Sequence, residues 1–412
     1  MPEFLQLTSR QEALDTFLHA LPTIDLYKET LPTEQALGRI LAEDIISGEM
    51  SPAFSRSTVD GYAVQAADTF GANESLPCYL PLAGEVAMGK PALTPIQPGT
   101  AWLIHTGGML PQGADAVVML EDTQKAGVSE IEISRAVAAG DNTICAGEDV
   151  MPGDVVLKTG TKLGPAQIGG LLALGIRQVL VAGKPLVGIL SSGDEVIPPH
   201  QTPLPGQIRD INSYSLQSLV ESHGGQTRLY GIAPDEITAF ESLIRKAFDE
   251  CDMLVVTAGS SASARDLTST VIQKLGKPGV LVHGVRIRPG KPTILAVCDG
   301  KPVIGLPGNP VSALVIAGFF VIPVLERLSG QTESTPRPML TAELTLPVPS
   351  VAGREDFVPV HLIAHQGGWK AEPIFFKSNM IFTLAQSDGL LHIPASAVGL
   401  SAGEKVEVYL TY

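Results

Sequence analysis

Apolar residues recur at helical spacing near the start of the chain. A helix is expected over 9–21, because its apolar positions would share one face. Ser9 and Glu12 have the spacing of a capping box at its start. The apolar positions are Leu14, Phe17, Leu18 and Leu21. A second helical stretch is expected within 24–50, over TEQALGRILAEDI.

From about residue 51 the pattern changes to short apolar segments separated by Gly and Pro. The segments include YLPLAGEVAMG, TAWLIHTGG, ADAVVMLED and EIEIS. Such segments are typical of strands joined by turns, so we expect a β-rich domain over 51–145. Residues 146–181 predict a strand, a turn and a helix that begins near Pro165. Together with 24–50, they are expected to form an elongated connecting domain.

Residues 182–330 alternate strand and helix patterns. PLVGILSS, QTRLYGIA, DMLVVTAG and PVIGLPG resemble strands, and amphipathic or apolar helical segments separate them. This alternation predicts right-handed βαβ units and a mostly parallel, doubly wound sheet. Residues 331–412 return to strand patterns and predict a small β-barrel or sandwich.

Composition narrows the class of protein. The 412 residues carry 28 basic and 43 acidic side chains, a net charge of −15, and no long basic run, which argues against a nucleic-acid partner. Four cysteines without a CxxC pair suit a reducing cytosol. The first residues lack the pattern of a signal peptide. The longest apolar run, Val311 to Leu325, contains Pro323 and is short for a membrane span. A cytoplasmic enzyme or binding protein without a membrane partner is expected.

Residues that could bind a ligand or catalyse a reaction lie just after the strands of the predicted sheet. Ligands of such sheets bind at the carboxyl ends of the strands, and small loops beside helix N-termini offer backbone N–H groups to anions. Three loops rich in small residues follow strands here, and Asp235 follows another. The loops contain Ser192, Gly193 and Glu195; Gly259, Ser260 and Asp266; and Pro307, Gly308, Asn309, Pro310 and Ser312.

Several of these residues have two interpretations. Glu195 and Asp266 are either helix caps or surface acids, or ligands of Mg²⁺, and their common edge favours the ligands. Asp235 is equally well explained as the N-cap of the next helix or as a functional acid. Asn309 and Pro310 suit a helix start, whereas Pro307 suggests the wall of a pocket.

One dense basic segment stands out in this acidic chain. Arg286, Arg288 and Lys291 lie within RIRPGKP, and the two arginines would point the same way in an extended segment. Such a group of cations suits a phosphate or another oxyanion. By themselves, Asp60-Gly61 and the HTGG segment at 105–108 indicate only turns. His361 and His365 are expected to be ordinary surface residues and not metal ligands.

Taken together, the motifs resemble those of the molybdopterin molybdenumtransferase family, which includes bacterial MoeA and the E-domains of gephyrin and its plant counterpart. The resemblance covers essentially the whole chain in the family's order. It rests on SRSTVDGYA (55–63), HTGGMLPQGADAVVMLED (105–122), GEDVMPGD (147–154), SSGDEV (191–196), RIRPGKP (286–292) and GLPGNPVSAL (305–314).

The resemblance implies four domains. These are a MogA-like α/β domain (9–23 with 182–330), an elongated connecting domain (24–50 with 146–181), a β-rich inserted domain (51–145) and a C-terminal β-barrel (331–412). It also implies a homodimer whose active site lies between the α/β domain of one subunit and the β-rich domain of the other. Contacts with a MogA-type adenylyltransferase and with molybdoenzyme maturation factors are implied as well.

The implied reaction inserts molybdate into adenylylated molybdopterin, with Mg²⁺ as cofactor and release of AMP. Glu195 and Asp266 are the implied metal ligands. The implied catalytic residues are Asp60, Thr106, Asp149, Glu195, Asp235, Asp266 and Arg288. The implied substrate-binding residues are Ser192, Gly193, Gly259, Ser260, Arg286, Lys291, Pro307, Gly308, Asn309, Pro310, Ser312, Arg354 and Ser378.

The sequence departs from the family at a few positions. AGSSASARD replaces a segment that usually reads close to GGVSVGD, and Gly284 stands where a lysine is usual. These departures leave the choice between molybdate and tungstate open. The alternatives are a tungstate-using paralogue and a non-catalytic molybdopterin-binding scaffold. The extra domains argue against a simple adenylyltransferase of the MogA type.

Overall fold

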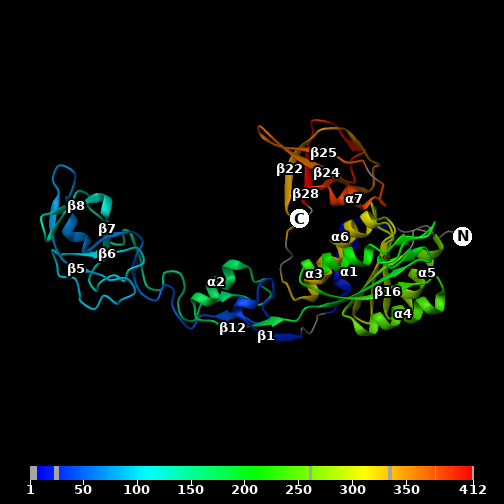
Figure 1. Cartoon of the computed structure of the whole chain (residues 1–412), viewed down its shortest axis with the longest axis horizontal. Coiled ribbons are helices and arrows are strands. Elements are labelled where there is room, and N and C mark those ends of the chain that lie inside the picture. Colours follow the sequence, from blue (N-terminus) through cyan, green and yellow to red (C-terminus); the bar gives the residue numbers. More distant parts are fainter. Residues whose placement is uncertain (1–6, 23–26, 259–261, 333–335, 376, 411–412) are drawn as a thin grey trace.

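The chain forms an α/β unit and a β-barrel at one end and a long arm that ends in a separate sheet (Figure 1). The computed structural model describes residues 7–22, 27–258, 262–332, 336–375 and 377–410, without the side chains of 262–266. The predicted fold class, a mixed α/β and β multidomain protein, is confirmed. The residue limits of the four domains remain predictions.

A six-stranded sheet forms the centre of the α/β unit, in the order β16-β13-β17-β21-β20-β18. The first four strands run parallel to their neighbours, and β20 and β18 are antiparallel. The predicted, mostly parallel sheet is thus present. Its strands are β13 (Leu186–Ser192), β16 (Gln226–Ala233), β17 (Met253–Ala258), β18 (Pro278–His283), β20 (Ile294–Cys298) and β21 (Lys301–Pro307). A small parallel pair, β14 (Val196–Ile197) and β15 (Ile208–Arg209), lies beside it.

Helices cover both faces of this sheet. Successive strand residues point to opposite faces, so Val255 joins one core while Leu254 and Val256 join the other. Helices α1, α3 and α6 pack on the first face, and α4 and α5 pack on the second. The helices are α1 (Arg10–Ala20), α3 (Asn212–Ser222), α4 (Ile237–Glu250), α5 (Ala262–Gln273) and α6 (Pro310–Leu328). The N-terminal helix therefore joins the α/β unit, with Ser9 as its N-cap.

Helix α6 is apolar on all sides because it lies between the sheet and the barrel. By length and composition it could cross a membrane, but 72% of its most apolar 18-residue window is buried inside the protein. Its Phe319 ring lies 4.5 Å from the ring of Phe357 in the barrel. One apolar face of the helix therefore packs on the sheet, and another packs on the barrel.

Five strands close into the C-terminal barrel. The order β24-β25-β22-β28-β26 returns to β24 through a β24–β26 pairing. A sixth strand, β19, comes from the α/β unit and runs parallel to the start of β24, with Arg288 opposite Asp356. A five-residue helix that the sequence did not predict, α7, precedes β26. The elements are β19 (Ile287–Arg288), β22 (Met339–Leu344), β23 (Val348–Pro349), β24 (Glu355–His365), β25 (Gly368–Pro373), α7 (Ile381–Ala385), β26 (Gly389–Ile393), β27 (Gly399–Leu400) and β28 (Lys405–Leu410).

The arm begins and ends in one antiparallel pair, β1 with β12, in which Lys28 lies opposite Ala182. The predicted helix within 24–50 is wrong: this stretch forms strands and a short 3-10 turn. Gly38 adopts a φ of +75°, and Gly38 and Leu41 donate backbone hydrogen bonds to Leu163 and Thr161. Pairing with 155–182 therefore overrides the local helical pattern. The elements are β1 (Lys28–Pro32), η1 (Thr33–Gln35), β2 (Ile45–Ile46), β11 (Val155–Leu157), α2 (Pro165–Ala173) and β12 (Gln178–Ala182).

The far end of the arm is rich in strands, as expected. Its main sheet has the order β7-β4-β6-β5-β9-β8. Its elements are β3 (Arg56–Ser57), β4 (Gly61–Val64), η2 (Ala66–Thr69), β5 (Cys78–Glu85), β6 (Ala101–Ile104), β7 (Ala116–Met119), η3 (Leu120–Asp122), β8 (Thr123–Ala126), β9 (Glu130–Ile133) and β10 (Thr143–Ile144). We call this part of the chain the distal domain.

Candidate active site

A cavity of about 770 Å³ lies where the carboxyl ends of β17 and β21 meet β19 and the residues before β24. Five cationic side chains line it: Arg286, Arg288, Lys291, Arg354 and Lys377. Within the described parts of the chain, no Asp or Glu lines it. For a protein of net charge −15, this is a strong local concentration of positive charge. We call it the cationic pocket.

Arg286, just before strand β19, and Arg288 within it lie on the same side, as the sequence predicted. Ile287 is buried between them, whereas Arg286 and Arg288 are exposed to the pocket. The next turn approaches α6 closely. Gly290 has a φ of +108°, and a Cβ there would lie 2.2 Å from a side-chain carbon of Ile316. Glycine is thus required for the basic loop to sit against the helix.

A buried carboxylate orients two of the cations. Asp356 is only 1% exposed, and its oxygens accept hydrogen bonds from Arg354 Nε at 2.8 Å and Nη2 at 3.2 Å. Arg288 Nη1 lies 3.5 Å from the same carboxylate. Because Asp356 holds these guanidinium groups from behind, their other N–H groups are left to face the pocket.

The start of α6 forms another wall of the pocket. Asn309 is the N-cap residue and Pro310 the first helical residue, as expected. The Asn309 side chain makes no capping hydrogen bond; its Nδ2 donates to Ser378 Oγ at 2.8 Å. Asn309 and Ser378 both line the pocket, together with Pro307 and Ser312. The same residues thus begin the helix and form a wall of the pocket.

Gly308 has a supporting contact instead. Its carbonyl accepts a hydrogen bond from Asn212 Nδ2 at 2.8 Å, and it is absent from the pocket lining. Gly259, Ser260 and the side chain of Asp266 lie outside the described residues.

Three acids gather at the ends of β13 and β16, beside a second cavity of about 450 Å³ that Gly193 and Asp194 line. Asp235 Nα–H donates to Asp194 Oδ1 at 3.1 Å. Burial raises the pKa of Asp235, and the negative charges of Asp194 and Glu195 raise it further. The N-cap of α4 is Glu236, so the N-cap interpretation of Asp235 is wrong. Ser192 is buried in this edge.

These acids suit a cation by charge and by donor type. Carboxylate oxygens are preferred ligands of Mg²⁺, and a cation would relieve the repulsion that raises the pKa of Asp235. Among the described residues, no three Asp, Glu, His or Cys groups are close enough to hold a metal by themselves. The remaining ligands would have to come from a phosphate substrate, from water or from Asp266.

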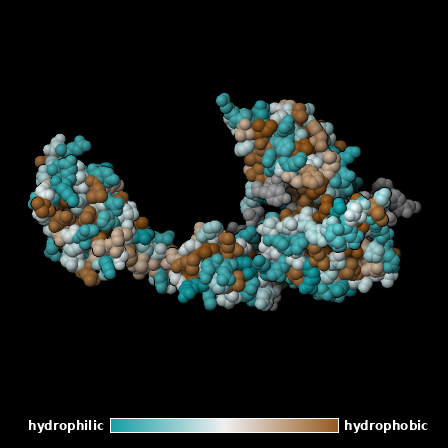
Figure 2. Space-filling model, in the orientation of Figure 1, coloured by the Kyte–Doolittle hydropathy of each residue, from teal (hydrophilic) through white to brown (hydrophobic). Residues whose placement is uncertain are grey.

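Asp60, Thr106 and Asp149 lie on the arm. Asp60 Oδ1 accepts hydrogen bonds from the Thr106 backbone N–H at 2.8 Å and from its hydroxyl at 3.2 Å. The backbone hydrogen bond from Thr106 is the main cause of the lowered pKa of Asp60, and His105 at 3.5 Å adds to it. Asp149 is exposed in the loop after β10. Figure 2 shows open space between the distal domain and the barrel, so the chain does not bring these residues to its own pocket.

Sequence reasoning missed Lys377 and Asp356. Lys377 precedes Ser378, which was assigned only by resemblance, and nothing local distinguishes it from a surface lysine. Asp356 had a usable signal, because it lies two residues after Arg354 in a strand and so faces the same side. A buried acid at that position needs a cationic partner.

Comparisons with known proteins agree along the whole chain. Three family models match: "MoeA N-terminal region (domain I and II)" over residues 8–175, "Probable molybdopterin binding domain" over 188–327 and "MoeA C-terminal region (domain IV)" over 341–411. A molybdopterin molybdenumtransferase of Haemophilus influenzae is 33% identical, over 96% of this chain and 97% of that protein. Molybdopterin molybdenumtransferase 2 of Mycobacterium tuberculosis is 33% identical, over 92% and 94%.

A solved structure agrees as well. The molybdopterin biosynthesis MoeA protein of Pyrococcus horikoshii OT3 is 34% identical and covers 98% of this chain and 100% of its own, with a TM-score of 0.83. On these grounds, the chain belongs to the MoeA family.

Proposed function

We propose that this protein is a molybdopterin molybdenumtransferase that inserts molybdate into adenylylated molybdopterin and releases AMP, in molybdenum cofactor biosynthesis. Curated relatives of this name are about 33% identical over more than 90% of the chain. The structural observation that carries the proposal is the cationic pocket, with five basic side chains and no acid among its described lining residues. Molybdate and a pyrophosphate are both compact oxyanions that such a pocket would bind.

The pocket residues have different roles in binding the substrate, according to the chemistry of their side chains. Arg288 and Arg354 present planar guanidinium groups, which suit oxygen pairs of a phosphate or molybdate. Lys291 and Lys377 act as point charges, and Arg286 adds to the field. Pro307 forms part of the wall, and Pro310 begins helix α6 next to it. Asn309 and Ser378 add polar groups with fixed directions, because they hydrogen-bond to each other.

Mg²⁺ is the proposed cofactor at the neighbouring acidic edge. Glu195 and Asp266 are the proposed ligands, and Asp235 would orient a bound water. A cation at this edge would neutralise phosphate charge on the substrate. The raised pKa of Asp235 is consistent with a group poised near like charges that a cation would stabilise.

We further propose a homodimer in which Asp60, Thr106 and Asp149 of a second subunit complete the site. The arrangement of the chain supports this, because the distal domain lies away from its own pocket (Figures 1 and 2). A MogA-type adenylyltransferase would supply the substrate in the cytoplasm, and maturation factors of molybdoenzymes would receive the product.

Complementation tests the shared site. Asp60→Ala and Arg288→Ala chains, inactive separately, are co-expressed and purified together. In a two-fold dimer, a mixed pair has one of its two sites with both residues intact. Random pairing makes about half of the dimers mixed, so about a quarter of wild-type activity should return in the whole preparation. No recovery in proven mixed dimers would place Asp60 outside the partner's site.

AMP release tests the reaction itself. Adenylylated molybdopterin and Mg²⁺ are incubated with the protein, with molybdate, with tungstate or with neither. Molybdate-dependent AMP release is the expected result. Release with tungstate alone would identify a tungstate-using paralogue, and binding without release under either oxyanion would favour a molybdopterin-binding scaffold.

A further inference from the structure

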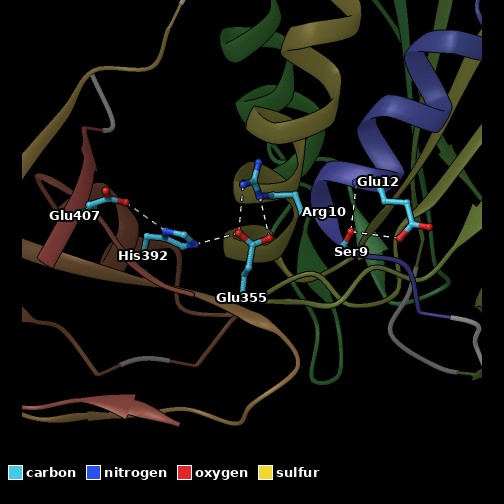
Figure 3. Close-up of polar contacts among 6 residues, drawn as sticks. All are labelled: Ser9, Arg10, Glu12, Glu355, His392 and Glu407. Atoms are coloured by element: carbon cyan, nitrogen blue, oxygen red, sulfur yellow. Dashed lines mark hydrogen bonds and ion pairs between the residues drawn. The ribbon is translucent and has the colours of Figure 1, made fainter. Parts of the chain in front are cut away.

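The first residues of the barrel strand β24 alternate between two sites. Arg354 lines the cationic pocket, and the buried Asp356 holds both Arg354 and Arg288 there without lining the pocket itself. Glu355, between Arg354 and Asp356, points to the opposite side of the strand. There it meets Arg10 of α1 and His392 of the barrel strand β26 (Figure 3).

Glu355 is the centre of a chain of polar contacts. Its Oε2 accepts a hydrogen bond from Arg10 Nε at 3.1 Å, and its Oε1 accepts one from Arg10 Nη2 at 3.2 Å. His392 Nε2 lies 3.0 Å from Oε1, and His392 Nδ1 lies 3.7 Å from Glu407 (Figure 3). The side chains of Arg10, Glu355 and His392 are 18%, 16% and 14% exposed, so water screens their attraction only in part.

Apolar rings enclose this polar chain. The Arg10 guanidinium carbon lies 4.9 Å from the centre of the Phe319 ring on α6. The His392 ring stacks on Phe357, with centres 5.0 Å apart. Residues of α1, α6 and the barrel therefore form one packed joint. We call Arg10, Glu355 and His392 the joint triad.

The joint triad lies directly behind the pocket. Glu355 is paired with Ile287 across the β19–β24 ladder, and its backbone N–H donates to the Arg286 carbonyl at 3.0 Å. This ladder is only two residue pairs long, Ile287 with Glu355 and Arg288 with Asp356. So short a pairing fixes the strand weakly by itself, and side-chain contacts must set the angle at which the barrel meets β19.

We propose that Glu355 is a positioning residue for the cationic pocket. By binding Arg10 and His392, it holds the start of β24 at the register where Asp356 reaches Arg288 and Arg354 enters the pocket. The joint triad thereby sets the affinity for anionic substrate without touching it. This inference rests on the proposed function only in taking the cationic pocket as the anion site.

Anion titration tests this role. AMP and inorganic molybdate are titrated separately into the full-length protein with Mg²⁺, by calorimetry. Arg288→Ala should weaken binding of at least one of them about tenfold, the effect of one lost charge-assisted hydrogen bond. Glu355→Gln and Arg10→Met should weaken the same anion several-fold. Arg10→Lys keeps the charge and should recover part of the loss.

A more exposed ion pair away from the pocket provides the control. Arg228 and Glu250 lie 2.9 Å apart on the same α/β unit, remote from the pocket lining. Arg228→Met should leave anion affinity unchanged. Turnover with the full substrate should show a raised KM with kcat nearly unchanged in Glu355→Gln, because a misplaced pocket loses ground-state binding. General loss of structure would lower kcat instead.

The outcomes separate the two proposals. If Arg288→Ala loses affinity while Glu355→Gln and Arg10→Met keep it, the positioning role is wrong and the pocket assignment stands. If Arg288→Ala keeps wild-type affinity for both anions, the pocket assignment is wrong and the positioning role with it. If Glu355→Gln fails to fold, Arg10→Lys and Arg10→Met decide, and equal affinity in these two would contradict the proposal.

Discussion

Arg288 and Asp356 lie opposite each other on two parallel strands, and the guanidinium of one reaches the carboxylate of the other at 3.5 Å. One strand belongs to the α/β unit and the other to the barrel. Since Asp356 also binds Arg354, a single buried anion keeps two like charges together at the edge of the cavity. The positive field of the pocket thus depends on a buried negative charge that is not part of its lining.

Replacement of Asp356 should destabilise the protein. In Asp356→Asn, two guanidinium groups lose the buried anion that they share. Because Arg288 and Arg354 are 54% and 33% exposed, we expect a loss of about 2 kcal/mol, less than the roughly 3–5 kcal/mol for a fully buried pair that loses one partner. Urea unfolding of the variant measures this loss. Glu343→Gln, at an exposed position of β22, is the control and should change stability by less than about 0.5 kcal/mol.

Replacement of Asp60 should remove activity and leave the fold intact. Asp60 is exposed on the distal domain and is held by Thr106, so Asp60→Ala deletes a surface carboxylate without opening a cavity. Molybdenum incorporation should be abolished, and the circular dichroism spectrum and melting temperature should match the wild type. Glu74→Gln, another exposed acid of the distal domain, should keep full activity. Normal incorporation by Asp60→Ala would remove this residue from the site.

Acid should weaken the joint triad. Burial raises the pKa of Glu355, but hydrogen bonds from His392 and Arg10 and their charges outweigh burial and hold the pKa below its ordinary value of 4.5. The stabilisation is therefore complete above the unfolded pKa and is lost as the pH falls through the folded one. The melting temperature should fall more steeply below about pH 5 in the wild type than in Glu355→Gln. Parallel curves would show that Glu355 does not contribute.

Replacement of Gly290 should distort the basic loop. An alanine there combines an unfavourable φ of +108° with a Cβ that would lie 2.2 Å from Ile316. We expect a cost of about 2–4 kcal/mol, the sum of backbone strain and overpacking. Gly231→Ala is the matched control, with a φ of +84° and open space around the new Cβ. The cost of Gly290→Ala should be smaller in an Ile316→Ala background than in the wild type, whereas the cost of Gly231→Ala should be the same in both.

The long periodic elements could be predicted from sequence because their local preference and their burial agree. Helix α4 shows this: Phe240, Ile244 and Phe248 are four residues apart, and all three are buried against the sheet. The stretch over 24–50 was predicted wrongly because its hydrogen-bond partners lie more than 100 residues away, at 155–182. A local pattern contains no information about such partners.

The candidate site was predictable where one segment contains the chemistry. The spacing of Arg286 and Arg288 in an extended strand was enough to place both on one side. Lys377 could not be assigned in this way, because it reaches the pocket only when the barrel docks on β19. The role of the Asn309 side chain was missed for the same reason: its partner, Ser378, belongs to the C-terminal part of the chain.

The antiparallel pair β1 and β12 has a consequence for the ancestry of the chain. Lys28 and Ala182 are cross-strand partners, so the chain leaves the α/β unit and comes back to it at a single point. Everything between them, the distal domain included, therefore joins two points of the chain that lie side by side at the edge of the α/β unit. A single insertion into one surface connection would account for the whole arm, and its excision would require no rearrangement of the sheet that remains.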